Sequence, residues 1–132
     1  MILVDTNVVI DVATGDPHWA EWSLNQLESA VARDSVVIND IVYAELSAGY
    51  RHTDELDNSL KTLRIAHAVI PKLALFLAGH AFRQYRRRRG VKTGVLPDFF
   101  IGAHAFVENA ALLTRDPDRV RAYFPTVTLI AP

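Results

Sequence analysis

The chain has 132 residues, half of them hydrophobic and 22% charged, with no cysteine. This composition fits one compact domain over residues 1–132, and it excludes a disordered chain, disulfides and thiolate metal sites. No apolar run approaches the ~18 residues of a membrane span, and the N-terminus lacks a signal-peptide pattern, so a cytoplasmic location is the default expectation.

Charge is distributed unevenly between the two halves of the chain. The net charge of −1 combines eleven acids and two bases in residues 1–60 with four acids and twelve bases in residues 61–132. This asymmetry favours one surface suited to cations or basic partners and another suited to polyanions.

Short apolar or β-branched runs alternate with segments of helical periodicity along the chain. The expected helices, in chain order, cover residues 8–13, 17–32, 41–50, 53–62, 71–89, 98–109 and 118–123. The expected strands cover residues 2–4, 36–38, 63–66, 111–113 and 127–130. This alternation predicts right-handed βαβ crossovers. The predicted fold class is therefore α/β, a three-layer sandwich with a central parallel sheet of about five strands flanked by helices.

Single residues add local expectations. The tryptophans Trp19 and Trp22 have helical spacing and are expected to face the core or a partner subunit. The helix over residues 98–109 is apolar nearly all round, which predicts deep burial. The five histidines show no metal-ligand spacing, and we expect His80 and His104 to be core residues rather than general bases.

Four acids are expected at one edge of the predicted sheet. Asp5 follows the first strand, and Glu45 lies on the helix after the second. Asp98 opens the buried helix, and Asp116 comes three residues after the fourth strand. Because the carboxyl ends of parallel strands form the site crevice of such folds, these four side chains can converge.

Each acid also has a purely structural interpretation. Asp5 and Asp98 suit helix caps, and Asp116 suits a turn. Glu45 is the only charge in residues 41–50, which favours function over a solvated face.

Four gathered carboxylates repel one another unless protons or cations neutralise them. Oxygen ligands without cysteine or a His-x-x-x-His pair favour Mg²⁺ or Mn²⁺ over zinc. Such an ion orients a phosphate and activates water, so the predicted chemistry is phosphodiester hydrolysis.

Four fragments carry a family resemblance. They are Val-Asp-Thr-Asn at 4–7, Tyr-Ala-Glu-Leu at 43–46, Leu-Pro-Asp-Phe-Phe-Ile-Gly-Ala at 96–103 and Leu-Leu-Thr-Arg-Asp at 112–116. Each is weak alone, but in this order and spacing the chain resembles the PIN-domain ribonucleases over its whole length. Within that family it is similar to the VapC-type toxins of bacterial toxin–antitoxin systems.

The resemblance implies a PIN-like fold and a catalytic metal site, with Asp5 and Asp98 as the foremost direct ligands of Mg²⁺ or Mn²⁺. The full implied set of catalytic and metal-binding residues is Asp5, Glu45, Asp98 and Asp116. The implied supporting residues are Asn7 and Thr114, through hydrogen bonds, and Asp118 as an outer member. The family pattern often places an aromatic residue after this last acid, whereas Arg119 stands here.

The resemblance further implies magnesium-dependent RNA cleavage, a homodimer, and inhibition by a cognate antitoxin protein. These three properties follow from the resemblance alone.

Six of the fourteen bases lie within ten positions, residues 83–92. Cations at a helix C-terminus complement its dipole, but four consecutive arginines exceed that need. We expect Arg86, Arg87, Arg88 and Arg89 to contact the RNA backbone, since phosphate binding requires charge without sequence preference.

Two other functions remain open from the sequence. A receiver-like signalling domain also binds Mg²⁺ in an acidic pocket, but it has paired acids after the first strand and a late lysine, which this chain lacks. A catalytically silent RNA-binding domain would use the acids structurally. The chain has no phosphate-cradling glycine motif and no Gly-x-Ser-x-Gly, so nucleotide-binding loops and serine hydrolases are not supported.

Overall fold

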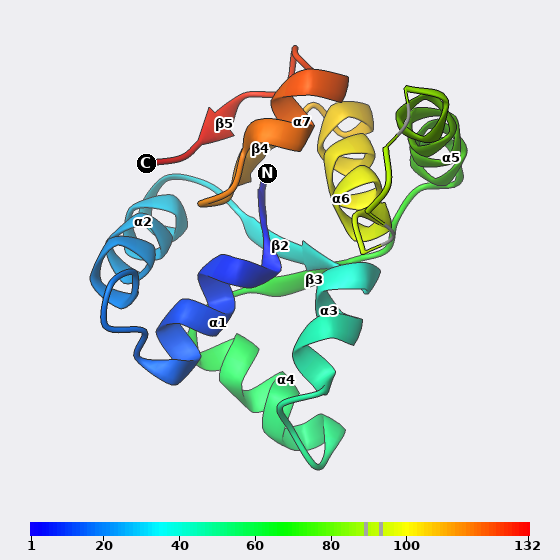
Figure 1. Cartoon of the computed structure of the whole chain (residues 1–132). Helices are drawn as coiled ribbons and strands as arrows, with labels where there is room; N and C mark the ends of the chain where they lie inside the picture. The colour runs from blue at the N-terminus through cyan, green and yellow to red at the C-terminus, as the bar shows by residue number, and fades with distance from the viewer. Residues whose placement is uncertain (89, 93) are drawn as a thin grey trace.

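A computed structural model of the chain describes residues 1–88, 90–92 and 94–132 (Figure 1). The helices of these residues are α1 Thr6–Thr14, α2 Ala20–Arg33, α3 Asp40–Ser47, α4 Thr53–Thr62, α5 Lys72–Arg87, α6 Leu96–Val107 and α7 Asp118–Tyr123. The strands are β1 Ile2–Val4, β2 Val36–Asn39, β3 Ala66–Ala68, β4 Ala111–Leu113 and β5 Leu129–Ile130. The alternation predicted from hydrophobic spacing is confirmed.

The five strands form one parallel sheet in the order β3-β2-β1-β4-β5. The first strand is central, with Ile2 in register with Val36 on one side and Ala111 on the other. Connections from β1 to β3 run in one direction across the sheet, and those from β3 to β5 run in the other. Right-handed crossovers therefore place α1 to α4 on one face and α5 to α7 on the opposite face. This is the three-layer α/β sandwich expected from the sequence (Figure 1).

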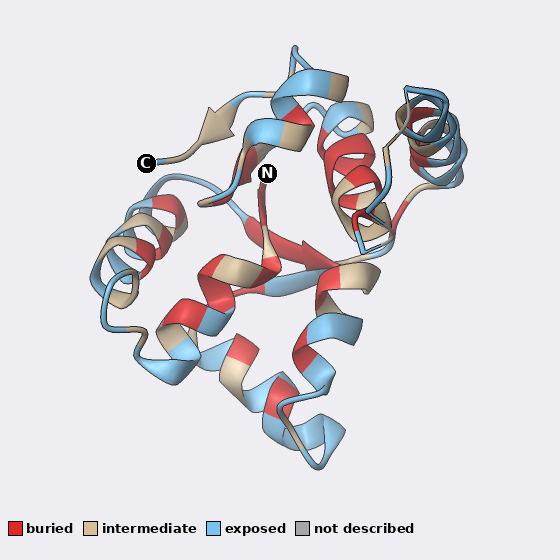
Figure 2. Ribbon diagram, viewed as in Figure 1, coloured by how far each residue is buried: buried red, intermediate tan, exposed pale blue. Residues whose placement is uncertain are grey.

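The core lies where the central strands meet the helices (Figure 2). All three residues of β1 and all four of β2 are buried, as continuous apolar strands covered on both faces should be. On α6, Phe99 is fully buried and its ring packs edge-on against Tyr123 of α7. This packing fixes the start of α6, where Asp98 lies, against α7.

Gly102 sets how closely α7 approaches α6. A Cβ atom at this position would lie 2.8 Å from the Phe124 Cδ2 atom and 3.3 Å from Val120 Cγ2. The missing side chain therefore lets the end of α7 pack directly on α6. Both helices carry charged residues at their starts, so this close approach also brings those charges together.

Several boundaries and placements differ from expectation. The third strand begins at Ala66 rather than near residue 63, because Arg64 has a φ of 60° and turns the chain first. Helix α6 begins at Leu96, since Pro97 is tolerated in a first turn, so Asp98 lies within that turn. His104 is buried as expected, whereas His80 is exposed beside the Phe76 ring, so its assignment to the core was wrong.

Trp19 and Trp22 are half-buried and contact each other edge to face. Among the described residues, no helix has both the length and the apolar character needed to cross a membrane.

Candidate active site

The candidate site lies at the carboxyl edge of the sheet, beside neighbouring strands β1 and β4. The connections leaving these two strands run in opposite directions, which opens a crevice at a topological switch point. Asp5 directly follows β1, and its backbone N–H donates to the Leu113 carbonyl at 2.9 Å. Thr114 and Asp116 follow β4. The sheet therefore brings Asp5 close to residues 114–116, which are more than 100 positions away in the sequence.

Asp5 is held by three hydrogen-bond donors. It is the N-cap of α1, and its Oδ1 accepts from the Thr6 backbone N–H at 2.7 Å. Its Oδ2 accepts from the Thr114 hydroxyl at 2.7 Å and from Asn7 Nδ2 at 3.2 Å. The structure thus contains the hydrogen bonds that the resemblance implied for Asn7 and Thr114.

Thr114 links Asp5 to Asp116. Its fully buried hydroxyl donates to Asp5 and accepts from the Asp116 backbone N–H at 3.0 Å. Asn7 spans the same gap, because its Oδ1 accepts from the Arg115 backbone N–H at 3.3 Å. These contacts fix the turn that carries Asp116 relative to the end of β1.

Glu45 reaches the site from α3. Its Oε1 accepts from the Thr6 hydroxyl at 2.7 Å, and Thr6 is itself buried in the first turn of α1. The start of α3 is fixed by the buried Asn39, whose side chain accepts from the Ile41 and Val42 backbone N–H groups. The charge of Glu45 is therefore directed toward Asp5 by neighbouring helices.

Asp98 and Asp116 form the other side of the site. Asp98 Oδ2 accepts from Arg119 Nη1 at 2.6 Å, in an ion pair between α6 and α7. Asp116 lies within electrostatic range of Asp98 and raises its pKa. A cavity of about 440 Å³ lies beside Arg119 and is also lined by Tyr85, Lys92, Asp116 and Asp118.

The electrostatics show the cost of gathering these carboxylates. Burial raises the pKa of Asp5 to about 6; the hydrogen bond from Thr114 opposes this rise, and the nearby charges of Asp98 and Glu45 add to it. Burial likewise raises the pKa of Asp98, Arg119 lowers it, and Asp116 raises it further. The carboxylates therefore interact as a group and lack sufficient positive charge.

Oxygen donors with unbalanced negative charge suit a hard divalent cation such as Mg²⁺ or Mn²⁺. The guanidinium at Asp98 shows that a cation is accommodated there. Within residues 1–88, 90–92 and 94–132, no three acidic or histidine side chains come close enough to form a complete set of metal ligands. The structure therefore brings the four predicted acids into one charged region without assembling them around one point.

The predicted outer acid Asp118 and the predicted RNA-binding arginines lie around the edge of the site. The Asp118 side chain is 88% exposed and pairs with Arg121 at 3.4 Å, so it lies at the rim of the cavity. Arg86, Arg87 and Arg88 are exposed at the end of α5. The guanidinium of Arg88 lies 5.7 Å from the centre of the Tyr123 ring, near the start of α6. Arg89 lies outside the described residues.

Sequence reasoning missed three contacts. The Thr6 bond to Glu45 lies in the fragment Val-Asp-Thr-Asn, in which only Asp5 and Asn7 were expected to have a role. The Arg119 bond to Asp98 coincides with the one position where the sequence departs from the family pattern. The third is a buried network in which Asp11 accepts from Ser23 Oγ at 2.8 Å and from Arg115 Nε at 2.8 Å. Nothing in the sequence distinguished Asp11 from the other acids.

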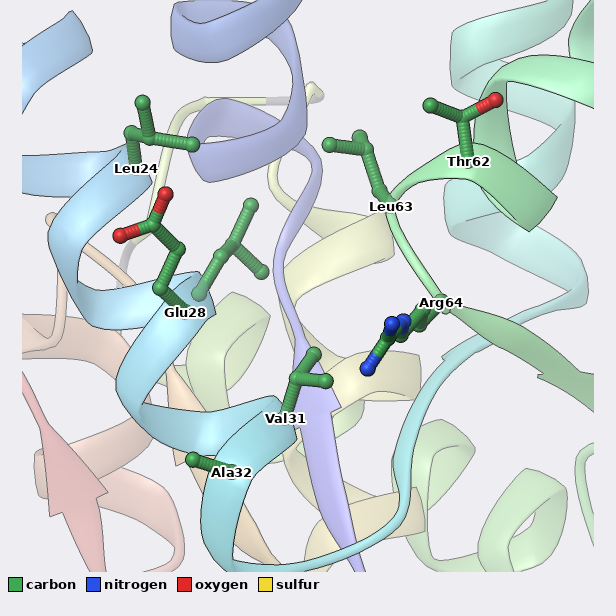
Figure 3. A pocket seen from close by; sticks show the side chains of 8 residues that line it. Leu24, Glu28, Val31, Ala32, Thr62, Leu63 and Arg64 are labelled. Atoms are coloured by element: carbon green, nitrogen blue, oxygen red, sulfur yellow. The ribbon is translucent and has the colours of Figure 1, made fainter.

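Other hollows on the surface lie away from the acids. A groove of about 330 Å³ lies between α2 and the end of α4. It is lined by apolar side chains such as Leu24 and Val31, with Glu28 and Arg64 at its sides (Figure 3). None of the predicted acids lines it. The predicted acids therefore lie at the carboxyl edge of the sheet and not in the groove.

A parallel α/β sandwich with carboxylates at the carboxyl edge of its sheet defines a class of domain suited to divalent-ion chemistry. The chain matches the family model of the PIN domain over residues 2–125, and it belongs to that family. The PIN-like fold expected from the resemblance is confirmed. No curated protein sequence matches the chain.

Solved structures share the fold over nearly the whole chain. VapBC2 from Rickettsia felis, bound to a promoter DNA fragment, matches with a TM-score of 0.73 and 22% identity, covering 99% of this chain and 98% of that one. VapBC-1 from nontypeable Haemophilus influenzae gives 0.72 and 18%, with 99% and 98% covered. FitAcB from Neisseria gonorrhoeae gives 0.68 and 24%, with 98% and 96% covered. At these identities the likeness establishes the fold.

Proposed function

We propose that the chain is a metal-dependent endoribonuclease, the toxin of a type II toxin–antitoxin pair, which hydrolyses RNA phosphodiester bonds with Mg²⁺ or Mn²⁺. The observation that carries the proposal is the position of Asp5, a half-buried carboxylate at the carboxyl edge of the sheet whose pKa is raised to about 6 by burial and by the nearby carboxylates of Asp98 and Glu45. Such a charge arrangement lowers stability and is typical of a functional site. The PIN family and the VapBC and FitAcB structures of the same fold support a nuclease toxin.

The proposed roles follow from position. Asp5 and Asp98 would hold the ion directly, and Glu45 and Asp116 would complete its surroundings from α3 and from the turn after β4. A bound divalent ion supplies a water of lowered pKa and neutralises charge on the scissile phosphate. Thr114 and Asn7 keep Asp5 Oδ2 in place, and Thr6 keeps Glu45 directed inward.

The sheet order argues against the receiver alternative. Receiver-type doubly wound domains have the order 2-1-3-4-5, whereas this sheet has the order β3-β2-β1-β4-β5. The silent RNA-binding alternative gives no reason for the raised pKa of Asp5, because structural acids usually gain partners that lower it.

Cleavage of RNA by the purified protein tests the proposal. We expect cleavage with Mg²⁺ or Mn²⁺, its loss with EDTA, and a fall of about 10² to 10³ in rate for Asp98→Asn. Asp54→Asn is the control, since this exposed acid in the first turn of α4 lies outside the site. Equal cleavage by wild type and Asp98→Asn would refute the role of Asp98 in the site, and no cleavage of structured or single-stranded RNA with either metal would refute the enzyme assignment.

The arginines at the end of α5 are proposed to bind the RNA backbone. For the double variant Arg86→Gln/Arg87→Gln, we expect RNA affinity to fall. The slope of log K against log salt should decrease in magnitude by about 1 to 2, because binding with fewer phosphate contacts releases fewer counterions from the RNA. The charge-matched control is Arg33→Gln/Arg51→Gln, two exposed arginines at the end of α2 and between α3 and α4. Fluorescence anisotropy with a labelled RNA in EDTA separates binding from cleavage, and an equal loss in both variants would contradict a localised RNA surface.

A homodimer and a cognate antitoxin complete the proposal. Exposed apolar side chains on α5, such as Leu73 at 58% and Phe76 at 63%, support contact with a second copy. Light scattering tests this, with a mass of two chains expected and a monomer contradicting it. Solved toxin–antitoxin complexes of the same fold support the antitoxin. Its test is inhibition of RNA cleavage by the product of a neighbouring short reading frame. RNA as the substrate makes the cytoplasm the proposed location.

A further inference from the structure

Arg119 occupies one oxygen of a proposed metal ligand. Its Nη1 donates to Asp98 Oδ2 at 2.6 Å, and its guanidinium carbon lies 5.6 Å from the centre of the Tyr85 ring. The side chain thus extends from the first turn of α7 across to α6, with the aromatic ring beside it. A positive charge already satisfies Asp98 in the chain without a metal.

This contact is built into the packing of α6 on α7. The absent Cβ of Gly102 lets Phe124 approach α6, and the Phe99 ring packs against Tyr123. These apolar contacts fix the two helix starts and place Asp98 and Arg119 opposite each other. The pair is therefore set by the fold, although its charged groups remain partly accessible.

The ion pair between Arg119 and Asp98 is weak enough for a divalent cation to displace Arg119. The side chains of Arg119 and Asp98 are 26% and 38% exposed, and partly exposed ion pairs hold weakly. Arg115 shows the contrast, because it binds both oxygens of Asp11, whose side chain is 1% exposed. Arg115, although its own side chain is 31% exposed, is thus held by both oxygens of a buried carboxylate, whereas Arg119 makes one contact to the partly exposed Asp98 and lines an open cavity.

A divalent ion and a guanidinium that shared Asp98 Oδ2 at short range would repel each other, so the two cations compete for this oxygen. When the ion binds this oxygen, the guanidinium of Arg119 can move into the adjacent cavity. The cavity of about 440 Å³ beside it is lined by Tyr85 and by Asp116 and Asp118, which offer an aromatic face and negative charge.

We propose that Arg119 is an internal counter-cation of Asp98 that competes with the divalent ion, so that metal binding requires Arg119 to move from Asp98 toward the Tyr85 cavity. The inference rests on the proposed metal site and deepens it by naming what regulates metal uptake. Arg119 is a positioning residue in this role, since it acts through Asp98.

Calorimetric titration with MnCl₂ alone, without RNA, tests the competition. For Arg119→Gln, we expect Mn²⁺ to bind about fivefold to tenfold more tightly than to wild type, because Asp98 loses its competing cation. Arg119→Lys keeps a charge without the planar fork and should fall between the two. Arg121→Gln is the matched control, an arginine on the same helix that pairs with Asp118, and its affinity should stay within about twofold of wild type.

A second readout follows Arg119 in the wild-type protein. In ¹⁵N spectra, the Arg119 side-chain N–H signal should shift during an Mg²⁺ titration in step with saturation. The Arg115 Nε–H signal, held by Asp11, should stay in place. Spectra of Arg119→Gln assign the first signal by its loss.

The outcomes separate this inference from the function beneath it. Equal or weaker Mn²⁺ binding by Arg119→Gln, or an Arg119 signal that does not shift, overturns the competition while leaving a metal site that depends on Asp98. Absence of Mn²⁺ binding in the wild type and in every variant overturns both the competition and the proposed metal-dependent nuclease.

Discussion

Asp5→Asn is expected to abolish most RNA cleavage and yet to make the metal-free protein more stable at neutral pH. The activity should fall by about 10³, because a direct ligand of the ion is removed. The stability should rise by about 1 to 2 kcal/mol. Burial and the nearby charges of Asp98 and Glu45 raise the pKa of Asp5 from 3.8 to about 6. At neutral pH this shift lowers the free energy of unfolding by at most about 3 kcal/mol. Lost hydrogen bonds from Thr114 and Asn7 offset part of the gain.

The sign of the pH dependence follows from the raised pKa. Below pH 3.8 Asp5 is protonated in both the folded and unfolded states, so it imposes no charge penalty. Between pH 3.8 and about 6 the unfolded chain ionises first, and the folded wild type loses stability relative to the variant. Above about pH 6 the difference is constant.

Urea denaturation in EDTA across this pH range measures the Asp5 effect. Asp16→Asn is the control of opposite sign, because backbone N–H groups of His18 and Trp19 lower the pKa of Asp16 and its half-buried carboxylate therefore stabilises the fold at neutral pH. A less stable Asp5→Asn protein at pH 7.5 would show that Asp5 is a structural cap and would remove the main support for a functional site.

Asp11→Ala is expected to destabilise the protein by about 2 to 4 kcal/mol, although Asp11 is not one of the proposed metal ligands. Its side chain is 1% exposed and accepts from Ser23 and from two nitrogens of Arg115. Its removal leaves the buried Ser23 hydroxyl without an acceptor and leaves the charge of Arg115, whose side chain is 31% exposed, without its partner. The melting temperature should fall by about 10 °C or more.

The double variant Asp11→Ala/Arg115→Ala provides the comparison, since removing both charges should recover part of the lost stability. Thermal denaturation in EDTA measures both variants. A loss below about 1 kcal/mol for Asp11→Ala would show that the Asp11–Arg115 pair does not support the turn that carries Asp116.

The architecture was predictable because its signals are local. β-Branched runs such as residues 36–38 and apolar helical spacing have periods that one sequence reveals. The third strand was placed a few residues early because the left-handed turn at Arg64 has no glycine or asparagine to mark it. The start of α6 was placed late because Asp98 resembled a cap, whereas Pro97 occupies the first turn.

The site was predictable in its acids and less so in its contacts. Asp5 and Asp116 follow strands, so strand order alone brings them to one edge. The contact between Asp98 and Arg119 depends on how closely α7 packs on α6, which Gly102 decides. Side-chain packing of this kind brings together residues that are far apart in the sequence, and the hydrophobic periodicity of the sequence does not reveal it.

The proposed nuclease and the proposed role of Arg119 both require a divalent ion among these carboxylates. The most direct measurement is an anomalous difference map from crystals of the protein grown or soaked in MnCl₂. We expect a peak bounded by the carboxylates of Asp5 and Asp98, with Arg119 displaced from Asp98. Crystals that show Arg119 still bound to Asp98 and no manganese peak between these two aspartates would contradict this expectation.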